Sequence, residues 1–239
     1  MEYSLKKANI DNLTGLWQLM GRTEWFDGLV QSVSWPYRTW LEWGQEKQYV
    51  DQHLLNRITP GYLFPVWDAD ADTAELESSL LANGFEMGLQ QLAMVLPLKA
   101  ETADTRTDTL NVCVLQNSAE VERWSLLCGQ AFGYQVDAAV IEQVRQQTDV
   151  EVFWAVREGE PIATAIMYQT GNVAGVHQVG VPPEHQGQGV ARALMQQLVA
   201  RAQARGVKHL CLQASVAGEP LYRSLGFLPQ FSIRSYRRR

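Results

Sequence analysis

The stretch from Val181 to Val199, V-P-P-E-H-Q-G-Q-G-V-A-R-A-L-M-Q-Q-L-V, restricts the fold more than any other part of the chain. An apolar run, 173–181, leads into it, and Pro182 and Pro183 end that run because proline cannot continue a central ladder. After Q-G-Q-G-V-A at 186–191, apolar residues recur at helical spacing from Leu194 to Ala202. The stretch therefore predicts a strand, a glycine turn and a helix.

This glycine turn has the composition of an anion-binding loop. Gly187 and Gly189 have no side chain, so a ligand can approach the backbone closely. The first N–H groups of a helix have no partner within it, and with the helix dipole they favour an anion such as phosphate. An ordinary tight connection between strand and helix is the alternative, because short glycine motifs also occur by chance.

Two motifs resemble the GNAT superfamily of N-acetyltransferases. Gln186, Gly189 and Ala191 occupy the defined positions of its pyrophosphate-binding motif, Q/R-x-x-G-x-G/A. Residues 221–227, L-Y-R-S-L-G-F, resemble the family's L-Y-x-x-x-G-F segment, and one helix and one strand fit between the two motifs. The resemblance covers roughly 111–239, and it implies an α/β (α+β) fold with a mixed, mostly antiparallel sheet flanked by helices.

The resemblance divides the chain into two predicted domains. Residues 110–239 would form a complete GNAT domain, and 1–98 a smaller domain of helices and a half-sheet. The linker 99–109 between them has almost no apolar side chain. The pattern strand, helix, strand at 61–98 echoes 209–236, so we hypothesise that the first domain is a degenerate half-copy of the second.

Local signals place the elements of the second domain. Ser118 is predicted to cap a helix that ends near Phe132, and Asp137 a second helix. A hairpin is predicted around the turn at 158–161. The predicted strands are 111–115, 150–157, 162–168, 173–181, 209–214 and 231–236, and a short helix is predicted at 218–225.

The N-terminal 60 residues are rich in tryptophan, with five of the chain's eight between Trp17 and Trp43. Asp11 is predicted to cap a first helix, and apolar residues from Trp40 to Leu55 suggest further helix. The tryptophans are interpreted as core residues. An aromatic wall for an apolar acceptor, or a dimer face, is the alternative. A strand at 62–67 is expected at a sheet edge, because proline lies within it.

The resemblance assigns the binding of acetyl-CoA to the glycine loop and the strand before it. The loop's backbone N–H groups would hold the pyrophosphate, and an N–H of the strand end would polarise the thioester carbonyl. The implied cofactor-binding residues are Val179, Gly180, Val181, Gln186, Gly187, Gln188, Gly189, Val190, Ala191, Arg192, Ser215 and Tyr222. Ser215 stands where relatives often carry asparagine, so its contact departs from the family pattern.

Two side chains are the candidate catalytic residues. The resemblance implies that Tyr222 protonates the departing thiolate. An alkyl amine is mostly protonated at pH 7, so a base must take its proton. His177 is the candidate because its intrinsic pKa suits the task and it lies in the strand before the loop. A water relay is the alternative, since no Asp or Glu lies within 173–181.

Composition narrows the location and partners. No apolar run reaches the length of a membrane span, and no secretory signal is visible. The three separated cysteines indicate buried thiols in a reducing cytoplasm, without metal spacing. Net charge is −6, yet 186–239 holds nine basic residues and one acid, which suits a polyanionic ligand. The overall acidity argues against nucleic acid, and a homodimer is left open.

The sequence therefore predicts an N-acetyltransferase that moves an acetyl group from acetyl-CoA to an unidentified primary amine by direct attack. A non-catalytic, acyl-CoA-binding regulatory protein is one alternative. A transferase for a longer acyl group is the other, with the tryptophan-rich region as its pocket.

Overall fold

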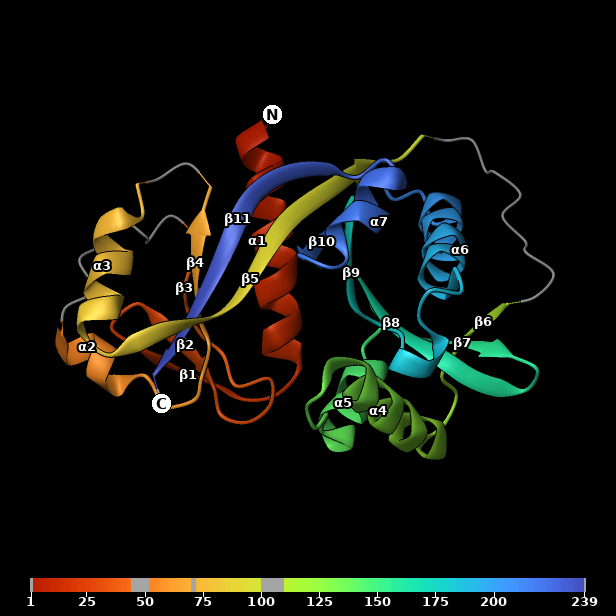
Figure 1. Cartoon of the computed structure of the whole chain (residues 1–239), viewed down its shortest axis with the longest axis horizontal. Coiled ribbons are helices and arrows are strands. Elements are labelled where there is room, and N and C mark those ends of the chain that lie inside the picture. Colours follow the sequence, from red (N-terminus) through yellow and green to blue (C-terminus); the bar gives the residue numbers. More distant parts are fainter. Residues whose placement is uncertain (1, 44–51, 70–71, 100–109, 239) are drawn as a thin grey trace. The chain divides into compact units, whose positions relative to one another are not determined.

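The computed structural model describes residues 2–43, 52–69, 72–99 and 110–238 (Figure 1). Its helices are α1 (Glu2–Leu19), α2 (Gln52–Arg57), α3 (Ala74–Ala82), α4 (Ser118–Phe132), α5 (Ala138–Arg145), α6 (Val190–Ala204) and α7 (Glu219–Ser224), with a 3-10 turn η1 (Pro183–His185). Its strands are β1 (Thr23–Phe26), β2 (Leu29–Ser32), β3 (Thr39–Leu41), β4 (Phe64–Asp68), β5 (Phe85–Pro97), β6 (Asn111–Val114), β7 (Val150–Arg157), β8 (Glu160–Thr170), β9 (Val173–Gly180), β10 (His209–Ser215) and β11 (Leu228–Arg238). Within the described ranges, no helix is both long and apolar enough to cross a membrane.

The chain forms two compact units, and neither is continuous in sequence. The first comprises 1–94, 213–220 and 228–239, and the second comprises 95–212 and 221–227. The predicted linker lies mostly at 100–109, outside the described residues. The predicted division into a domain at 1–98 and a domain at 110–239 remains a prediction.

The second unit contains a mixed, mostly antiparallel sheet. Its strands follow the order β10-β9-β8-β7-β6, with β10 parallel to β9 and the other neighbours antiparallel. Helices α4 and α6 pack against β8 and β9, and α5 packs against β7. The predicted α/β class, a mixed and mostly antiparallel sheet flanked by helices, is confirmed.

Two of the three local predictions for the second unit are confirmed, and the predicted cap of α4 is wrong. The cap of α4 is Asn117, whose side chain accepts a hydrogen bond from the Glu120 N–H; Ser118 is the first helical residue. Asn117 takes the cap because its backbone is extended, as an N-cap requires. The predicted cap of α5 is confirmed, since Asp137 accepts from the Ala139 N–H at 2.9 Å. The hairpin at 158–161 is also confirmed.

The first unit departs from the predicted N-terminal helices. Helix α1 begins at Glu2, so Asp11 lies inside it, where it pairs with Lys7 one turn earlier. Trp40 lies in β3, paired with Val30 of β2, so the predicted helix around Trp40 is wrong. A single buried aromatic fits a strand as well as a helix, and here pairing with β2 decides. Part of that predicted helix, 44–51, lies outside the described residues.

The tryptophans of the first unit are mainly core residues. Trp17, Trp35 and Trp40 are buried, and the rings of Trp17 and Trp40 meet edge-on with centroids 5.4 Å apart. Trp25 has 57% of its surface exposed, and Trp43 is half-buried. The burial of these three supports the core interpretation, because a buried ring cannot offer a wall to an acceptor.

Strands β4, β11 and β5 lie side by side in the first unit, in that order. Figure 1 shows β11 and β5 side by side. Strand β4, which contains Pro65, is at the sheet edge as predicted. The C-terminal strand β11 pairs antiparallel with β4, from Ser232 opposite Asp68 to Tyr236 opposite Phe64. The segments 61–98 and 209–236 both contain strand, helix and strand, but the half-copy hypothesis remains a proposal.

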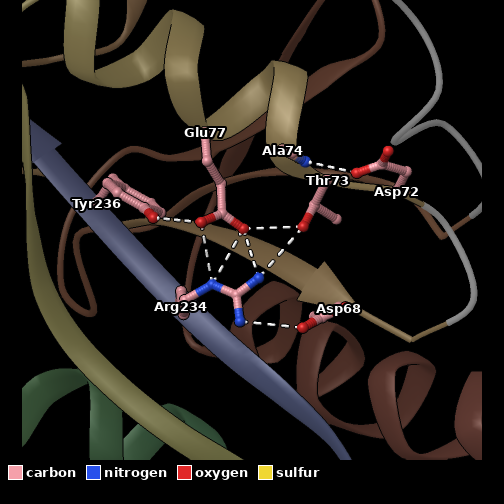
Figure 2. Close-up of polar contacts among 7 residues, drawn as sticks. All are labelled: Asp68, Asp72, Thr73, Ala74, Glu77, Arg234 and Tyr236. Atoms are coloured by element: carbon pink, nitrogen blue, oxygen red, sulfur yellow. Dashed lines mark hydrogen bonds and ion pairs between the residues drawn. The ribbon is translucent and has the colours of Figure 1, made fainter.

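A charged cluster joins β11 to α3 and β4 (Figure 2). Arg234 donates to both carboxylate oxygens of Glu77, to Asp68 at 3.0 Å and to the hydroxyl of Thr73 at 3.2 Å. The Tyr236 hydroxyl donates to Glu77 at 2.7 Å. Burial alone would raise the pKa of Glu77, but hydrogen bonds from Arg234, Tyr236 and Thr73 outweigh it and lower that pKa. The cluster therefore fastens the C-terminal strand within the first unit.

Candidate active site

The glycine loop lies between β9 and α6 in the second unit, as the sequence predicts. Gly187 and Gly189 have φ values of 71° and 75°, a left-handed conformation that glycine adopts at little cost. A Cβ atom added to either would meet no atom within 4 Å, so the loop surface around both is open. The loop therefore has both the conformation and the free space that close ligand approach requires.

Helix α6 begins without a side-chain cap. Gly189 is its N-cap and provides no side-chain hydrogen bond, whereas Asn117 and Asp137 cap α4 and α5 in the same unit. The first N–H groups of α6 therefore lack the acceptor that the other two helices have. Such groups, with the positive end of the helix dipole, favour a phosphate or another anion.

The glutamine side chains of the loop donate hydrogen bonds to nearby backbone carbonyl groups. Gln186 donates to the carbonyl of Val181 at 2.9 Å, and Gln188 donates to the carbonyl of Glu184 at 3.0 Å. Arg157, at the end of β7, donates to the side chain of Gln188 at 2.9 Å. Arg157 thus adds a positive charge to the loop. Sequence reasoning missed it, because only the sheet brings β7 to this position.

A second arginine joins α6 to α7, which contains Tyr222. Arg192, in the first turn of α6, is exposed and donates to the hydroxyl of Ser224 at 2.9 Å. The structure thus links two regions that contain predicted site residues. One is the glycine loop with α6, and the other is α7, the short helix of the second motif.

Much of the basic charge at 186–239 is neutralised locally. Arg201 and Arg205 both bind Glu151, and Arg234 binds Glu77 and Asp68. Glu151 is consequently engaged and is a poor attractor for a cationic amine. Arg157, which contacts the loop, and Arg192, which lies in the first turn of α6, are therefore better sources of attraction for a polyanion than the whole basic segment.

Strand β9 contains a bulge immediately before the loop. His177 pairs with Ile166 and Gly180 with Thr164, so Gln178 and Val179 together face one residue of β8. Gln178 has a φ of 51°. A Cβ atom at Gly180 would lie 2.9 Å from Ala131, Phe132 and Thr164, so only glycine fits this closely packed strand end. The bulge sets the direction of the backbone at 179–181, the predicted carbonyl-binding segment.

Tyr222 is buried, with 9% of its surface exposed, and its ring meets Phe227 edge-on with centroids 5.8 Å apart. Burial raises the pKa of Tyr222 to about 12, because the phenolate form would lose its hydration. The side chain is therefore protonated at neutral pH and able to donate a proton.

The remaining predicted residues lie as follows. His177 is on β9 and buried. Ser215, at the end of β10, is exposed and accepts a hydrogen bond from the Gly218 N–H at 3.1 Å, so it stabilises the turn that leads to α7. The roles assigned to His177 and Ser215 remain predictions.

The open space around Gly189 gives a test of the loop. Gly189→Ala is expected to weaken CoA binding at least ~10-fold, because the new methyl group occupies the surface a ligand must approach, and to cost about 1–2 kcal/mol of stability for the left-handed conformation. Isothermal calorimetry and denaturant unfolding measure the two effects. Gly171→Ala is the matched control, since its φ is 59° and its added Cβ also meets nothing within 4 Å. Equal CoA affinity in wild type and Gly189→Ala would contradict a binding role for the loop.

Solved structures share this fold. A GCN5-related N-acetyltransferase from Kribbella flavida is 17% identical and has a TM-score of 0.66, covering 98% of this chain and 95% of its own. A GCN5-related N-acetyltransferase from Sphaerobacter thermophilus is 14% identical, with a TM-score of 0.64 over 88% of this chain and 79% of its own. A putative acetyltransferase from the GNAT family of Novosphingobium aromaticivorans is 14% identical, with a TM-score of 0.60 over 97% and 99%.

Sequence comparison finds a family match for one segment of the chain. No curated protein matches the chain. The family model described as acetyltransferase (GNAT) family matches residues 119–227, which include β9, the glycine loop, α6 and Tyr222. The match supports acyl transfer as the general reaction. Residues 119–227 therefore match the acetyltransferase (GNAT) family, and the solved structures above share the fold of the chain.

Proposed function

We propose that this protein transfers an acetyl group from acetyl-CoA to a primary amine by direct attack. The observation that carries the proposal is the start of α6, which follows two left-handed glycines and has no side-chain cap. Arg157 contacts this loop through Gln188, and Arg192, in the first turn of α6, joins α6 to α7 through Ser224. An anion site that is linked through Arg192 and Ser224 to the helix of a buried, protonated phenol fits a thiolate-releasing reaction.

Each chemical task has a candidate group in the second unit. Backbone N–H groups of 186–191 would hold the pyrophosphate, and those of 179–181 would polarise the thioester carbonyl. His177, or a water molecule, would take the proton of the amine so that its nitrogen can attack. As the new C–N bond forms and the C–S bond breaks, Tyr222 would give its proton to the sulfur.

The cysteines support a reducing compartment as the place of action. Cys113, Cys128 and Cys211 are all free thiols, and Cys128 and Cys211 are buried. Burial raises the pKa of both buried thiols to about 12, so they are neutral and unreactive at physiological pH. We accordingly propose a cytoplasmic location.

Thermal unfolding with acetyl-CoA, CoA and longer acyl-CoAs tests the function. A ligand at a hundred times its Kd stabilises the folded protein by about 2.7 kcal/mol, a shift of several degrees in Tm. We expect this shift with acetyl-CoA and CoA, followed by thiol release in a screen of primary amines. A shift only with longer acyl-CoAs would favour the longer-acyl transferase, and binding without turnover of any amine would favour a regulatory protein. No shift with any acyl-CoA would overturn the proposal.

A further inference from the structure

The bulge of β9 has an unusual backbone for its sequence. Gln178 has a φ of 51°, in the left-handed region that a residue with a Cβ atom rarely adopts. Glycine is the usual residue at such a bulge position. Gln178 can persist there only if its surroundings hold it, so the contacts of this side chain and backbone are informative.

Two hydroxyl groups hold Gln178 from different elements. Thr164 on β8, which is fully buried, donates from its hydroxyl to the carbonyl of Gln178 at 3.0 Å. Tyr134, in the connection between α4 and α5, donates from its hydroxyl to the side-chain oxygen of Gln178 at 3.0 Å. The buried thiol of Cys128 adds a weaker contact with the same oxygen at 3.5 Å. The backbone and the side chain of Gln178 are therefore both fixed.

Tyr134 is itself held in place by packing. Its ring stacks on Phe132, with centroids 5.6 Å apart and an interplanar angle of 20°. The carbonyl of Tyr134 lies so close to α4 that a Cβ atom at Gly129 would be 2.8 Å from it. Phe132 in turn lies against Gly180, because a Cβ atom there would be 2.9 Å from its ring. The end of α4 and the connection after it thus contact the bulge at Gly180 and Gln178, while the Phe132 and Tyr134 side chains stay partly exposed.

We propose that Thr164 and Tyr134 are positioning residues, which act through Gln178 to hold the β9 bulge and fix the direction of the N–H groups of Val179 and Gly180. The inference rests on the proposed function, in which these N–H groups polarise the thioester carbonyl. An N–H group contributes to catalysis only when it is aimed before the reaction begins, so a loosened bulge costs turnover rather than binding.

The experiment compares variants that remove one hydroxyl with variants that keep it. Thr164→Val and Tyr134→Phe remove a hydroxyl at nearly constant volume, and Thr164→Ser restores it. Thr39→Val and Tyr62→Phe are matched controls, because they remove hydroxyls that bond to Gln31 and to the Val33 carbonyl in the first unit. The measurements are kcat and KM for acetyl transfer to the best amine of the screen, Kd for CoA, and hydrogen exchange of the amides at 179 and 180.

We expect Thr164→Val and Tyr134→Phe each to lower kcat about 10-fold, as for the loss of one well-placed hydrogen bond. Kd for CoA should change less than ~2-fold, while the two bulge amides exchange faster. Thr164→Ser should recover most of the lost kcat, and the controls should keep both kcat and exchange.

The outcomes separate this inference from the function on which it rests. A wild-type protein that neither binds CoA nor releases thiol would overturn the proposed function. An active wild type whose Thr164→Val and Tyr134→Phe variants keep kcat and amide exchange would overturn only the positioning role. Parallel losses of kcat and CoA affinity in these variants would also overturn it, because they would indicate a general disruption of the fold.

Discussion

Tyr222→Phe is expected to lower kcat for acetyl transfer about 100-fold or more, while Kd for CoA changes less than ~2-fold. The substitution removes only the hydroxyl, and phenylalanine keeps the edge-on contact with Phe227. Burial raises the pKa of Tyr222 to about 12, so the wild-type side chain holds its proton at neutral pH, and the departing thiolate can receive that proton as its charge develops. Without that proton, the thiolate would leave as an anion in a partly dehydrated site.

Steady-state thiol release and CoA calorimetry on the same preparations measure the two quantities. Tyr62→Phe is the control, since it removes a tyrosine hydroxyl that bonds to the Val33 carbonyl in the first unit. An equal loss of turnover and CoA affinity in Tyr222→Phe would contradict the acid role and indicate that the hydroxyl serves binding.

Arg234→Met is expected to lower the free energy of unfolding by roughly 3 kcal/mol, the lower end of the cost of breaking a buried ion pair. The lower end applies because Arg234 and Glu77 keep 23% and 18% of their side-chain surfaces exposed. Methionine preserves much of the packing of the aliphatic part of the arginine side chain. Glu77 and Asp68, however, both lose the cation with which they pair. Denaturant unfolding at pH 7 measures the change.

Arg237→Met is the matched control on the same strand. Its pair with Glu86 is 3.8 Å long and about half exposed, so its loss should cost less than ~1 kcal/mol. A similar cost for both variants would mean that the Arg234 cluster contributes no more than a surface pair.

The same cluster predicts how stability depends on pH. The folded pKa of Glu77 is lowered, so its contribution is complete above the pKa of the unfolded chain and is lost as pH falls through the folded value. In Arg234→Met, the effect of burial on the pKa of Glu77 outweighs the remaining hydrogen bonds. The contribution of Glu77 to stability therefore disappears in this variant. The difference in stability between wild type and variant should therefore narrow as the pH falls below ~4. An unchanged difference across this range would exclude Glu77 as the titrating group.

The site was predictable where its information is local. A glycine at a left-handed position and an uncapped helix start are encoded within a few residues, so Gly187 and Gly189 could be named from the sequence. Tyr222 could be named only because 221–227 resembles a GNAT segment. Arg157 and Thr164 could not, because each reaches its partner only through the pairing of β7, β8 and β9. Tyr134 carried no motif, and its contact with Gln178 spans 44 residues.

The sequence by itself determined the local architecture of the second unit. The α5 cap at Asp137, the hairpin at 158–161 and the strand, glycine turn and helix at 173–204 depend on backbone preferences and short-range hydrogen bonds. Only the tertiary structure decided that Trp40 lies in a strand, and that β11 pairs with β4 and is fastened by Arg234 to Glu77, 157 residues away. Strand pairing and ion pairing of this kind depend on burial and on partners distant in sequence, so local periodicity does not predict them.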